Sequence, residues 1–289
     1  MAPFVVSPFV APAWDLGHCI LQPENRPLIM GIVNLTPDSF FDSSRTDNTE
    51  AAVTRARQLI AEGADLLDLG AESSRPGAQP VSTQEEIDRL LPVVTALARE
   101  TDIPLSIDTR RAETARHALA ICPCAINDIT AGRDPLMFEL AAQQKCGLVL
   151  MHMQGTPDTM QKHPAYNDPV AEITGWLAGR ARLAEEAGVL PERILVDPGL
   201  GFGKTLEHNL ALLNNLKKVA GGRPHLLGAS RKRFIAGITG AGVEDRLPGS
   251  LAALVAAWQN GTTVVRVHDV AATIQFLDVL RAMAGTPPL

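Results

Sequence analysis

Polar side chains stand at the ends of several short apolar runs, and their types indicate a site for a flat, nitrogen-rich ring. Asp108 and Asp197 carry carboxylates that only accept hydrogen bonds, while Asn127 both accepts and donates. Together they match the edge of an aminopyrimidinone, which is the hydrogen-bonding face of a pterin or a guanine. Lys232 can donate to a carbonyl or a ring nitrogen of the same heterocycle.

A pair of cations indicates that this ring is joined to an anion. Arg266 and His268 are two residues apart at the end of one apolar run, so on a strand their side chains face the same way. Guanidinium and imidazole groups suit the oxygens of a phosphate or a diphosphate. Further polar residues that end such runs are Asn34, Glu72, Ser74, Arg75, Asp128, His152, Ser230 and Arg231. Each of these alone could equally cap a helix or fill a barrel rim, but so many polar ends together favour a binding site.

The glycine-rich segment 197–205 does not fit either nucleotide-binding pattern that it resembles. It contains Gly-Lys-Thr, but Pro198 stands where the phosphate-binding loop needs glycine. Lys204 stands where the dinucleotide-binding pattern needs its third glycine. We therefore expect glycines that let the backbone pass close to a ring, with Phe202 as an apolar wall. His152 could belong to the site, although a buried core histidine is as good an interpretation.

The elements that must position these residues form a repeated unit. An apolar run and a helix-patterned stretch alternate eight times, which predicts a parallel sheet covered on both faces. Eight such units favour a closed (β/α)₈ barrel, an α/β fold in which the strand ends form the active site. The apolar runs are 28–33, 65–70, 104–108, 124–128, 147–152, 193–197, 225–230 and 262–267.

The helix signals and the N-terminal segment add detail to this prediction. Asn48 and Thr49 can cap a helix over 51–61, and Ser82 with Glu85 forms a capping-box pattern before a helix that Pro92 would kink or interrupt. Residues 14–27 are expected to plug the N-terminal end of the barrel. Residues 1–13 are expected to be a flexible extension, and residues 14–289 a single domain.

Composition and charge exclude several classes of partner. The net charge of −6 comes without a basic run, which argues against nucleic acid, and no apolar stretch is long enough for a membrane span. The four cysteines show no disulfide-like regularity and suit a reducing cytoplasm. Cys122 and Cys124 form a lone pair without further ligands at metal spacing, so zinc is not predicted.

Eight polar or glycine-containing strings stand at or near the ends of the apolar runs. They are IMGIVNLTPDSFFDSS (29–44), DLLDLGAESSRPGA (65–78), SIDT (106–109), NDI (127–129), MHMQGTP (151–157), DPGLGFGKT (197–205), GASRKRF (228–234) and RVHDV (266–270). These strings resemble the motifs of the dihydropteroate synthase family, in the family's order and across all eight units, and the resemblance covers about residues 14–285.

The resemblance implies a barrel enzyme, a transferase of folate biosynthesis that joins a pterin diphosphate to p-aminobenzoate. The pterin would lie deep in the barrel on Asp108, Asn127, Asp197 and Lys232. The remaining implied roles are diphosphate binding by Asn34, Ser74, Arg266 and His268, Mg²⁺ binding near Asn34, p-aminobenzoate binding by Ser74, Arg75, Pro76, Phe202 and Ser230, and pairing of Asp42 with Arg75 when the first two loops close. The family also implies a cytoplasmic homodimer, through helices such as 247–259, and a sulfonamide target.

The mechanism implied by the resemblance is dissociative. Diphosphate leaves the methylene carbon of the pterin, and the uncharged aniline nitrogen attacks the resulting cation. This explains the absence of a distinctive nucleophile in the sequence. The first loop departs from the family, because Phe41-Asp42-Ser43-Ser44 replaces the usual Ser-Asp-Gly-Gly, which bears on loop kinetics and sulfonamide affinity.

Two other functions fit part of the pattern. A pterin-binding methyltransferase that passes a methyl group to a corrinoid would share the barrel and the pterin-facing residues, but would not need Arg266 and His268. A degenerate relative that binds pterin without turnover should have lost Asp108, Lys232 or Arg266, and all three are present.

Overall fold

Eight parallel strands form the centre of the molecule in the computed structural model, which describes residues 6–35, 45–73 and 79–285. The strands are β3 (Leu28–Asn34), β4 (Leu66–Gly70), β5 (Leu105–Asp108), β6 (Ala125–Asp128), β7 (Leu148–Met151), β8 (Ile194–Asp197), β9 (Leu226–Leu227) and β10 (Val264–Val267). They pair in the order β8-β7-β6-β5-β4-β3-β10-β9. A bridge between Val196 and His225 joins β8 to the start of β9 and closes the barrel. The (β/α)₈ prediction is confirmed, with a strand in each of the eight apolar runs.

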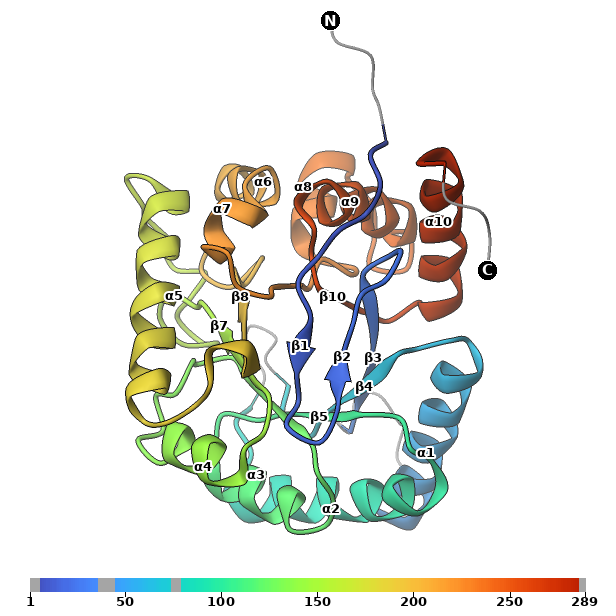
Figure 1. Ribbon diagram of the computed structural model, residues 1–289, viewed down its shortest axis with the longest axis vertical. Coiled ribbons are helices and arrows are strands. Elements are labelled where there is room, and N and C mark those ends of the chain that lie inside the picture. The colour runs from blue at the N-terminus through green and yellow to red at the C-terminus, as the bar shows by residue number, and fades with distance from the viewer. Residues whose placement is uncertain (1–5, 36–44, 74–78, 286–289) are drawn as a thin grey trace, which may run out of the picture.

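Helices follow the strands and surround the barrel in chain order (Figure 1). They are α1 (Arg45–Ala61), α2 (Thr83–Glu100), α3 (Ala112–Leu119), α4 (Met137–Gln144), α5 (Pro169–Glu186), a 3₁₀ turn η2 (Pro191–Arg193), α6 (Leu206–Leu213), α7 (Leu216–Ala220), α8 (Arg233–Thr239), α9 (Leu247–Asn260) and α10 (Val270–Met283). The residues of β6, β7 and β8 are all buried, which explains why the sequence shows apolar runs without alternation.

Two helix predictions need correction, and one is confirmed. Ser82 caps α2 and accepts a hydrogen bond from the Glu85 N–H at 3.1 Å, as the capping pattern predicts. The same helix runs on through Pro92, so Pro92 does not interrupt it, and the alternative of a kink stays a prediction. Helix α1 begins at Arg45, so Asn48 and Thr49 lie inside it rather than at its N-cap. Side-chain capping propensity is a local signal, and it did not determine where this helix begins.

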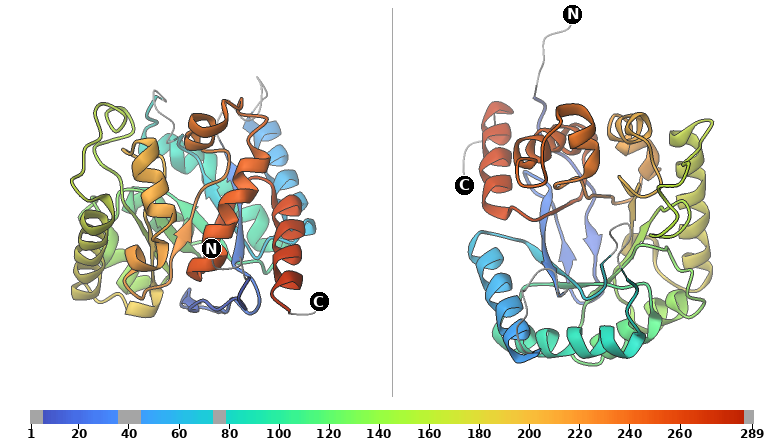
Figure 2. Two further views of the ribbon diagram at one scale, coloured as in Figure 1. Left: turned by 90° about the horizontal axis from the view of Figure 1, so that it is seen from above. Right: turned by 180° about the vertical axis from the view of Figure 1, so that it is seen from behind.

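The segment before the first barrel strand fills the N-terminal end of the barrel, as predicted. It forms a small antiparallel pair, β1 (Trp14–Asp15) and β2 (Ile20–Leu21), which lies at one end of the barrel (Figure 2, left). Trp14 and Leu16 are fully buried among inward-facing strand residues such as Met30. This layer is apolar, whereas the polar residues of the predicted site stand at the carboxyl ends of the strands.

Part of the segment 1–13, which we expected to be a flexible extension, contacts α9. Phe9 is buried, and its ring lies 5.2 Å from that of Trp258 in α9. The Trp258 indole N–H also donates to the Ser7 carbonyl at 2.8 Å. Proline-rich segments without periodicity give no signal for such contacts, so the sequence did not predict them. The boundary between an extension and a domain at residue 14 stays a prediction.

Candidate active site

A cavity of about 490 Å³ lies at the carboxyl ends of the strands. This is the end of a (β/α)₈ barrel where active sites are found. Its walls include every described residue to which the sequence assigned a role in the site. These residues are Asn34, Asp108, Asn127, Asp197, Phe202, Ser230, Lys232, Arg266 and His268. The other predicted residues, Asp42, Ser74, Arg75 and Pro76, lie outside the described residues.

Arg266 lies between two carboxylates on neighbouring strands. Its Nη2 donates to Asp108 at 2.8 Å, and its Nε donates to Asp68 at 2.6 Å. Asp68 also accepts from the Asn127 amide nitrogen at 3.1 Å. Arg266 thus keeps N–H groups of Nη1 and Nη2 for a ligand, because these two bonds use only part of its five donors.

Burial disfavours the charged form of both pocket carboxylates. It raises the pKa of Asp108 to about 7, against the opposing charge of Arg266 and with a further upward contribution from Asp68. Burial also raises the pKa of Asp197, although the Gly199 N–H donates to this carboxylate at 2.7 Å and Lys232 favours its charge. Both groups can therefore bind a ring that brings its own N–H donors, because such donors stabilise the carboxylate.

Lys232 and Phe202 form one wall of the cavity. The Lys232 ammonium lies 4.1 Å from the centre of the Phe202 ring, and Lys232 immediately precedes α8. Burial lowers the pKa of Lys232 to about 8, although Asp197 favours its charged form. An ammonium with a pKa near 8 is still mostly protonated at neutral pH, so it can donate to a ring carbonyl or nitrogen.

Ser230 and His268 lie together beside Arg266. The Ser230 hydroxyl is 3.0 Å from the His268 Nδ1 and accepts from the His268 backbone N–H at 3.2 Å. Burial, together with Arg266 and Arg231, lowers the pKa of His268 to about 4. The imidazole is therefore neutral in the free protein, and an arriving anion would favour its protonation.

A strained residue holds Ser230 and Lys232 in place. Arg231 between them has a φ of 55°, a left-handed conformation that costs a non-glycine residue roughly 1–3 kcal/mol. Its guanidinium makes a bidentate pair with Asp269 at 2.7 and 3.0 Å, and its backbone N–H donates to Ser250 at 2.8 Å. These bonds offset the strain and fix the turn that carries the two pocket residues.

The glycine-rich loop after β8 passes close to the end of β7. At Gly199 (φ 66°), an added Cβ would lie 2.0 Å from the His152 carbonyl oxygen, so no side chain fits there. Lys204 is buried under the loop, and its ammonium contacts the His152 Nδ1 at 3.0 Å and the Phe202 carbonyl at 2.9 Å. Lys204 thus ties Phe202 to the end of β7, and His152 takes part in this support instead of lining the cavity.

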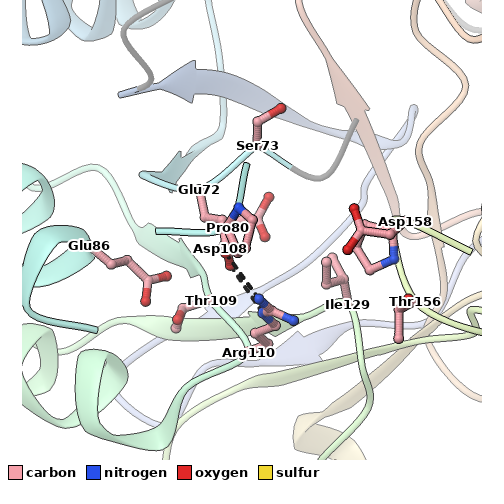
Figure 3. A pocket seen from close by; sticks show the side chains of 11 residues that line it. Glu72, Ser73, Pro80, Glu86, Asp108, Thr109, Arg110, Ile129, Thr156 and Asp158 are labelled. Carbon is pink, nitrogen blue, oxygen red and sulfur yellow. Dashed lines mark hydrogen bonds and ion pairs between the residues drawn. The ribbon is translucent and has the colours of Figure 1, made fainter. Parts of the chain in front are cut away.

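A second chamber of about 280 Å³ adjoins the cavity and shares Glu72, Ser73, Asp108 and Ile129 with it. Figure 3 shows this chamber, with Arg110 reaching the Glu72 carboxylate at 3.0 Å. Arg111 also donates to Glu72 at 3.0 Å and to the Val81 carbonyl at 2.7 Å. Arg111 therefore links Glu72 and Val81, the two ends of the segment 72–81.

Sequence reasoning missed the supporting roles of three residues. Asp68 is a carboxylate inside an apolar strand run, which is itself a signal of a buried polar role. Lys204 was considered only as part of a nucleotide-binding pattern. Glu72 was recognised as a polar strand end, but its two arginine partners come from the loop after β5. Pairing of this kind cannot be deduced from spacing along the chain.

The described residues contain no group of three or more histidine, cysteine or acidic side chains that could hold a metal ion. Over the same residues, no helix is both long and apolar enough to cross a membrane.

Comparison with known proteins agrees with this geometry. Residues 30–268 match the family model described as pterin binding enzyme. The dihydropteroate synthase of Neisseria meningitidis serogroup B is 46% identical over 278 residues, which cover 93% of this chain and 97% of the relative.

Two solved structures of the Xanthomonas albilineans dihydropteroate synthase are also similar. The one with 4-aminobenzoic acid is 43% identical with a TM-score of 0.88, covering 96% of this chain and 100% of the other. The one with 7,8-dihydropteroate is 42% identical with a TM-score of 0.85 and the same coverage. The chain therefore belongs to the dihydropteroate synthase family of pterin-binding enzymes.

Proposed function

We propose that this chain condenses (7,8-dihydropterin-6-yl)methyl diphosphate with 4-aminobenzoate, giving 7,8-dihydropteroate and diphosphate for folate synthesis. One observation carries the proposal: acceptors for a pterin edge line the same cavity as Arg266 and His268, which can bind a diphosphate. The names of the relatives, and the complexes of the Xanthomonas albilineans protein with 4-aminobenzoic acid and 7,8-dihydropteroate, support it.

The pterin ring would bind deep in the cavity, at the carboxyl ends of the strands. Asp108, Asn127 and Asp197 would accept hydrogen bonds from the ring N–H and amino groups, and Lys232 would donate to its carbonyl or a ring nitrogen. Asp108 would then exchange Arg266 for the ring as its partner. The 6-substituent lies at the other end of a pterin from its amino group, so the reactive methylene carbon would point away from these acceptors.

The reaction exchanges one bond at that methylene carbon for another. The C–O bond breaks and its electron pair leaves with the diphosphate, whose negative charge Arg266 and a protonated His268 would stabilise. The aniline nitrogen then forms the new C–N bond and releases its proton to water. The fixed carboxylates Asp108 and Asp197 favour the positive charge that develops on the pterin in between.

The donor set fits a magnesium ion that is held mainly by the substrate. Asn34 lines the cavity and offers an amide oxygen, and Mg²⁺ usually takes few protein ligands together with phosphate oxygens and water. When bound, Mg²⁺ would neutralise charge on the diphosphate.

The 4-aminobenzoate would bind on the outer side of the ring. Phe202 offers an apolar face, and Ser230 offers a hydroxyl near the start of α8. The expected contributions of Ser74, Arg75 and Pro76, and the pairing of Arg75 with Asp42, fall outside the described residues and stay predictions.

Arg266 and His268 also separate this function from its rivals. A pterin-dependent methyltransferase has no diphosphate to stabilise, whereas Arg266 and His268 both line this cavity. A degenerate relative would have no reason to keep Arg266 oriented by two carboxylates.

Two features outside the site support a cytoplasmic homodimer. The four cysteines are free, which suits a reducing compartment. Exposed apolar side chains lie on α8 and α10, on either side of the expected contact helix α9: Ile238 is 56% exposed, as is Val279, and Met283 is 59% exposed.

The experiment is to incubate the protein with the pterin diphosphate, 4-aminobenzoate and Mg²⁺, and to measure dihydropteroate by mass spectrometry. We expect product from the wild type and roughly a hundredfold less from Lys232→Ala, because that variant loses a charge-assisted bond to the ring and one of the cations near Asp197. Wild-type protein that binds the pterin but forms no product would contradict the proposal. Full activity of Lys232→Ala would contradict the assignment of the ring site.

A further inference from the structure

Asp68 is a carboxylate beneath the floor of the pterin cavity. It lies in the middle of β4, is fully buried, and does not line the cavity. Its neighbour in register on β5 is Ser106, which is also fully buried. A carboxylate at this depth is costly unless it has partners, so its contacts indicate its purpose.

The first contact fixes the direction of an amide. Asp68 Oδ2 accepts from the Asn127 Nδ2 at 3.1 Å. A carboxylate offers acceptors only, so the N–H side of the Asn127 amide must face Asp68. The amide oxygen then lies on the opposite side, where it can accept a hydrogen bond from a ring.

The second contact keeps Arg266 in position. The same Oδ2 atom accepts from the Arg266 Nε at 2.6 Å, while the other end of the guanidinium donates to Asp108 at 2.8 Å. If the ring takes Asp108 from Arg266, the bond to Asp68 remains. Arg266 then stays in the cavity with its freed N–H group available to the anion.

We infer that Asp68 is a positioning residue of the pterin site, which sets the orientation of Asn127 and retains Arg266 when Asp108 changes partner. This inference rests on the proposed function, because it assigns Asp108 to the ring and Arg266 to the diphosphate. Asp68 itself does not touch the substrate.

Asp68→Asn and Ser106→Ala test the inference as a matched pair. Asparagine keeps the size of the side chain but removes its charge and presents an N–H group that can turn the Asn127 amide around. Ser106→Ala perturbs the same buried layer, yet the Ser106 hydroxyl has no hydrogen-bond partner among the described residues. We expect KM for the pterin diphosphate to rise about tenfold in Asp68→Asn, and to stay at the wild-type value in Ser106→Ala.

The pH dependence of pterin affinity distinguishes positioning from general loss of structure. Asp108 must be ionised to accept from the ring, so affinity falls as the pH drops below its pKa of about 7. Asp68, Glu86 and Asp128 raise this pKa, whereas Arg266 lowers it. Removing the charge of Asp68 should therefore lower the pKa of Asp108, so that pterin affinity is lost at a lower pH in the variant than in the wild type. A merely loosened barrel would leave the pH at which affinity is lost unchanged.

A spectroscopic measurement keeps the test independent of turnover and of the stability of the variant. In wild-type protein, the Nε–H of Arg266, assigned with Arg266→Lys, should resonate downfield and exchange slowly because Asp68 accepts from it. In folded Asp68→Asn, the signal should move upfield and exchange faster.

The outcomes separate the two proposals. The inference is overturned by fast exchange of the Arg266 Nε–H in the wild type, by wild-type KM and pH dependence in Asp68→Asn, or by an equal effect of Ser106→Ala. If the wild type yields no dihydropteroate while the Arg266 signal behaves as expected, Asp68 still positions Arg266 and only the proposed reaction fails.

Discussion

At the scale of single residues, the site consists of ionisable groups whose charges depend on what is bound. Burial raises the pKa of Asp108 to about 7 and lowers that of His268 to about 4. The free cavity therefore holds less charge than its residue types suggest. Substrate groups of opposite character, N–H donors for the carboxylates and phosphate oxygens for His268, would restore that charge on binding.

Diphosphate binding should be linked to protonation of His268. At pH 6 the imidazole is neutral in the free protein, since its pKa is about 4. An adjacent diphosphate raises that pKa, so binding takes up a proton, and affinity weakens as the pH rises above the free pKa toward the bound one. Titration calorimetry with inorganic diphosphate and Mg²⁺, in two buffers of different ionisation enthalpy, measures the uptake.

His268→Gln provides the control for that titration. Glutamine keeps a hydrogen-bonding side chain but cannot be protonated, so it isolates the contribution of the imidazole from that of the diphosphate itself. We expect less proton uptake and about tenfold weaker binding in the variant. Equal uptake by the two proteins would show that His268 stays neutral in the complex.

At the scale of elements, a partly buried ion-pair network joins the loop after β4 to α2 and α3. Arg111 donates to Glu72 at 3.0 Å, to Glu86 at 2.8 Å and to the Val81 carbonyl at 2.7 Å. Thr114 in α3 donates to Glu86 at 2.7 Å. Burial acts to raise the pKa of Glu72, but the hydrogen bonds from Arg110 and Arg111 outweigh it, and the pKa is lowered.

Arg111→Met should destabilise the protein by roughly 3 kcal/mol, because it leaves the buried Glu86 carboxylate without its cation. The lowered pKa of Glu72 means that its contribution is present above the unfolded pKa and is lost as the pH falls through the folded one. The loss in Arg111→Met should therefore be largest near neutral pH. Urea unfolding at pH 7 and pH 4 measures it.

Arg57→Met is the matched control for this network. Arg57 also pairs with a glutamate, Glu100, at 2.8 Å, but the arginine side chain is 56% exposed. Exposed pairs contribute little to stability, so the midpoint should hardly move. A similar shift of the urea unfolding midpoint in both variants would mean that this network contributes no more to stability than a surface pair does.

The elements were largely predictable from sequence, whereas their supports were not. Apolar strand runs, and polar residues such as Asp108 and Arg266 at their ends, repeat with the period of the fold, so both the barrel and the cavity lining follow from the pattern. The roles of Asp68 and Lys204 were not predicted, because they depend on distant partners. Asp68 contacts Asn127, 59 residues away, and Lys204 contacts His152, 52 residues away. Such distant pairings exist only once the barrel has closed.

At the scale of the whole molecule, the two ends of the barrel differ in composition and in role: the N-terminal end is an apolar plug, and the carboxyl end contains the cavity. Trp14 and Leu16 fill the N-terminal end, and Phe9 packs on the outside against Trp258. The carboxyl end contains the charged residues that line the cavity, which are individually destabilising when buried without partners. Burial of apolar side chains at the N-terminal end thus offsets the free-energy cost of burying charged side chains at the carboxyl end. The cavity can therefore keep carboxylates and cations in close contact.

The most direct test of the account is a crystal structure of the wild-type protein with the pterin diphosphate and Mg²⁺, without 4-aminobenzoate. We expect the ring edge on Asp108, Asn127 and Asp197, and the diphosphate on Arg266 and His268. A ring bound in the neighbouring chamber beside Arg110, or a diphosphate directed toward Asp197, would contradict the account.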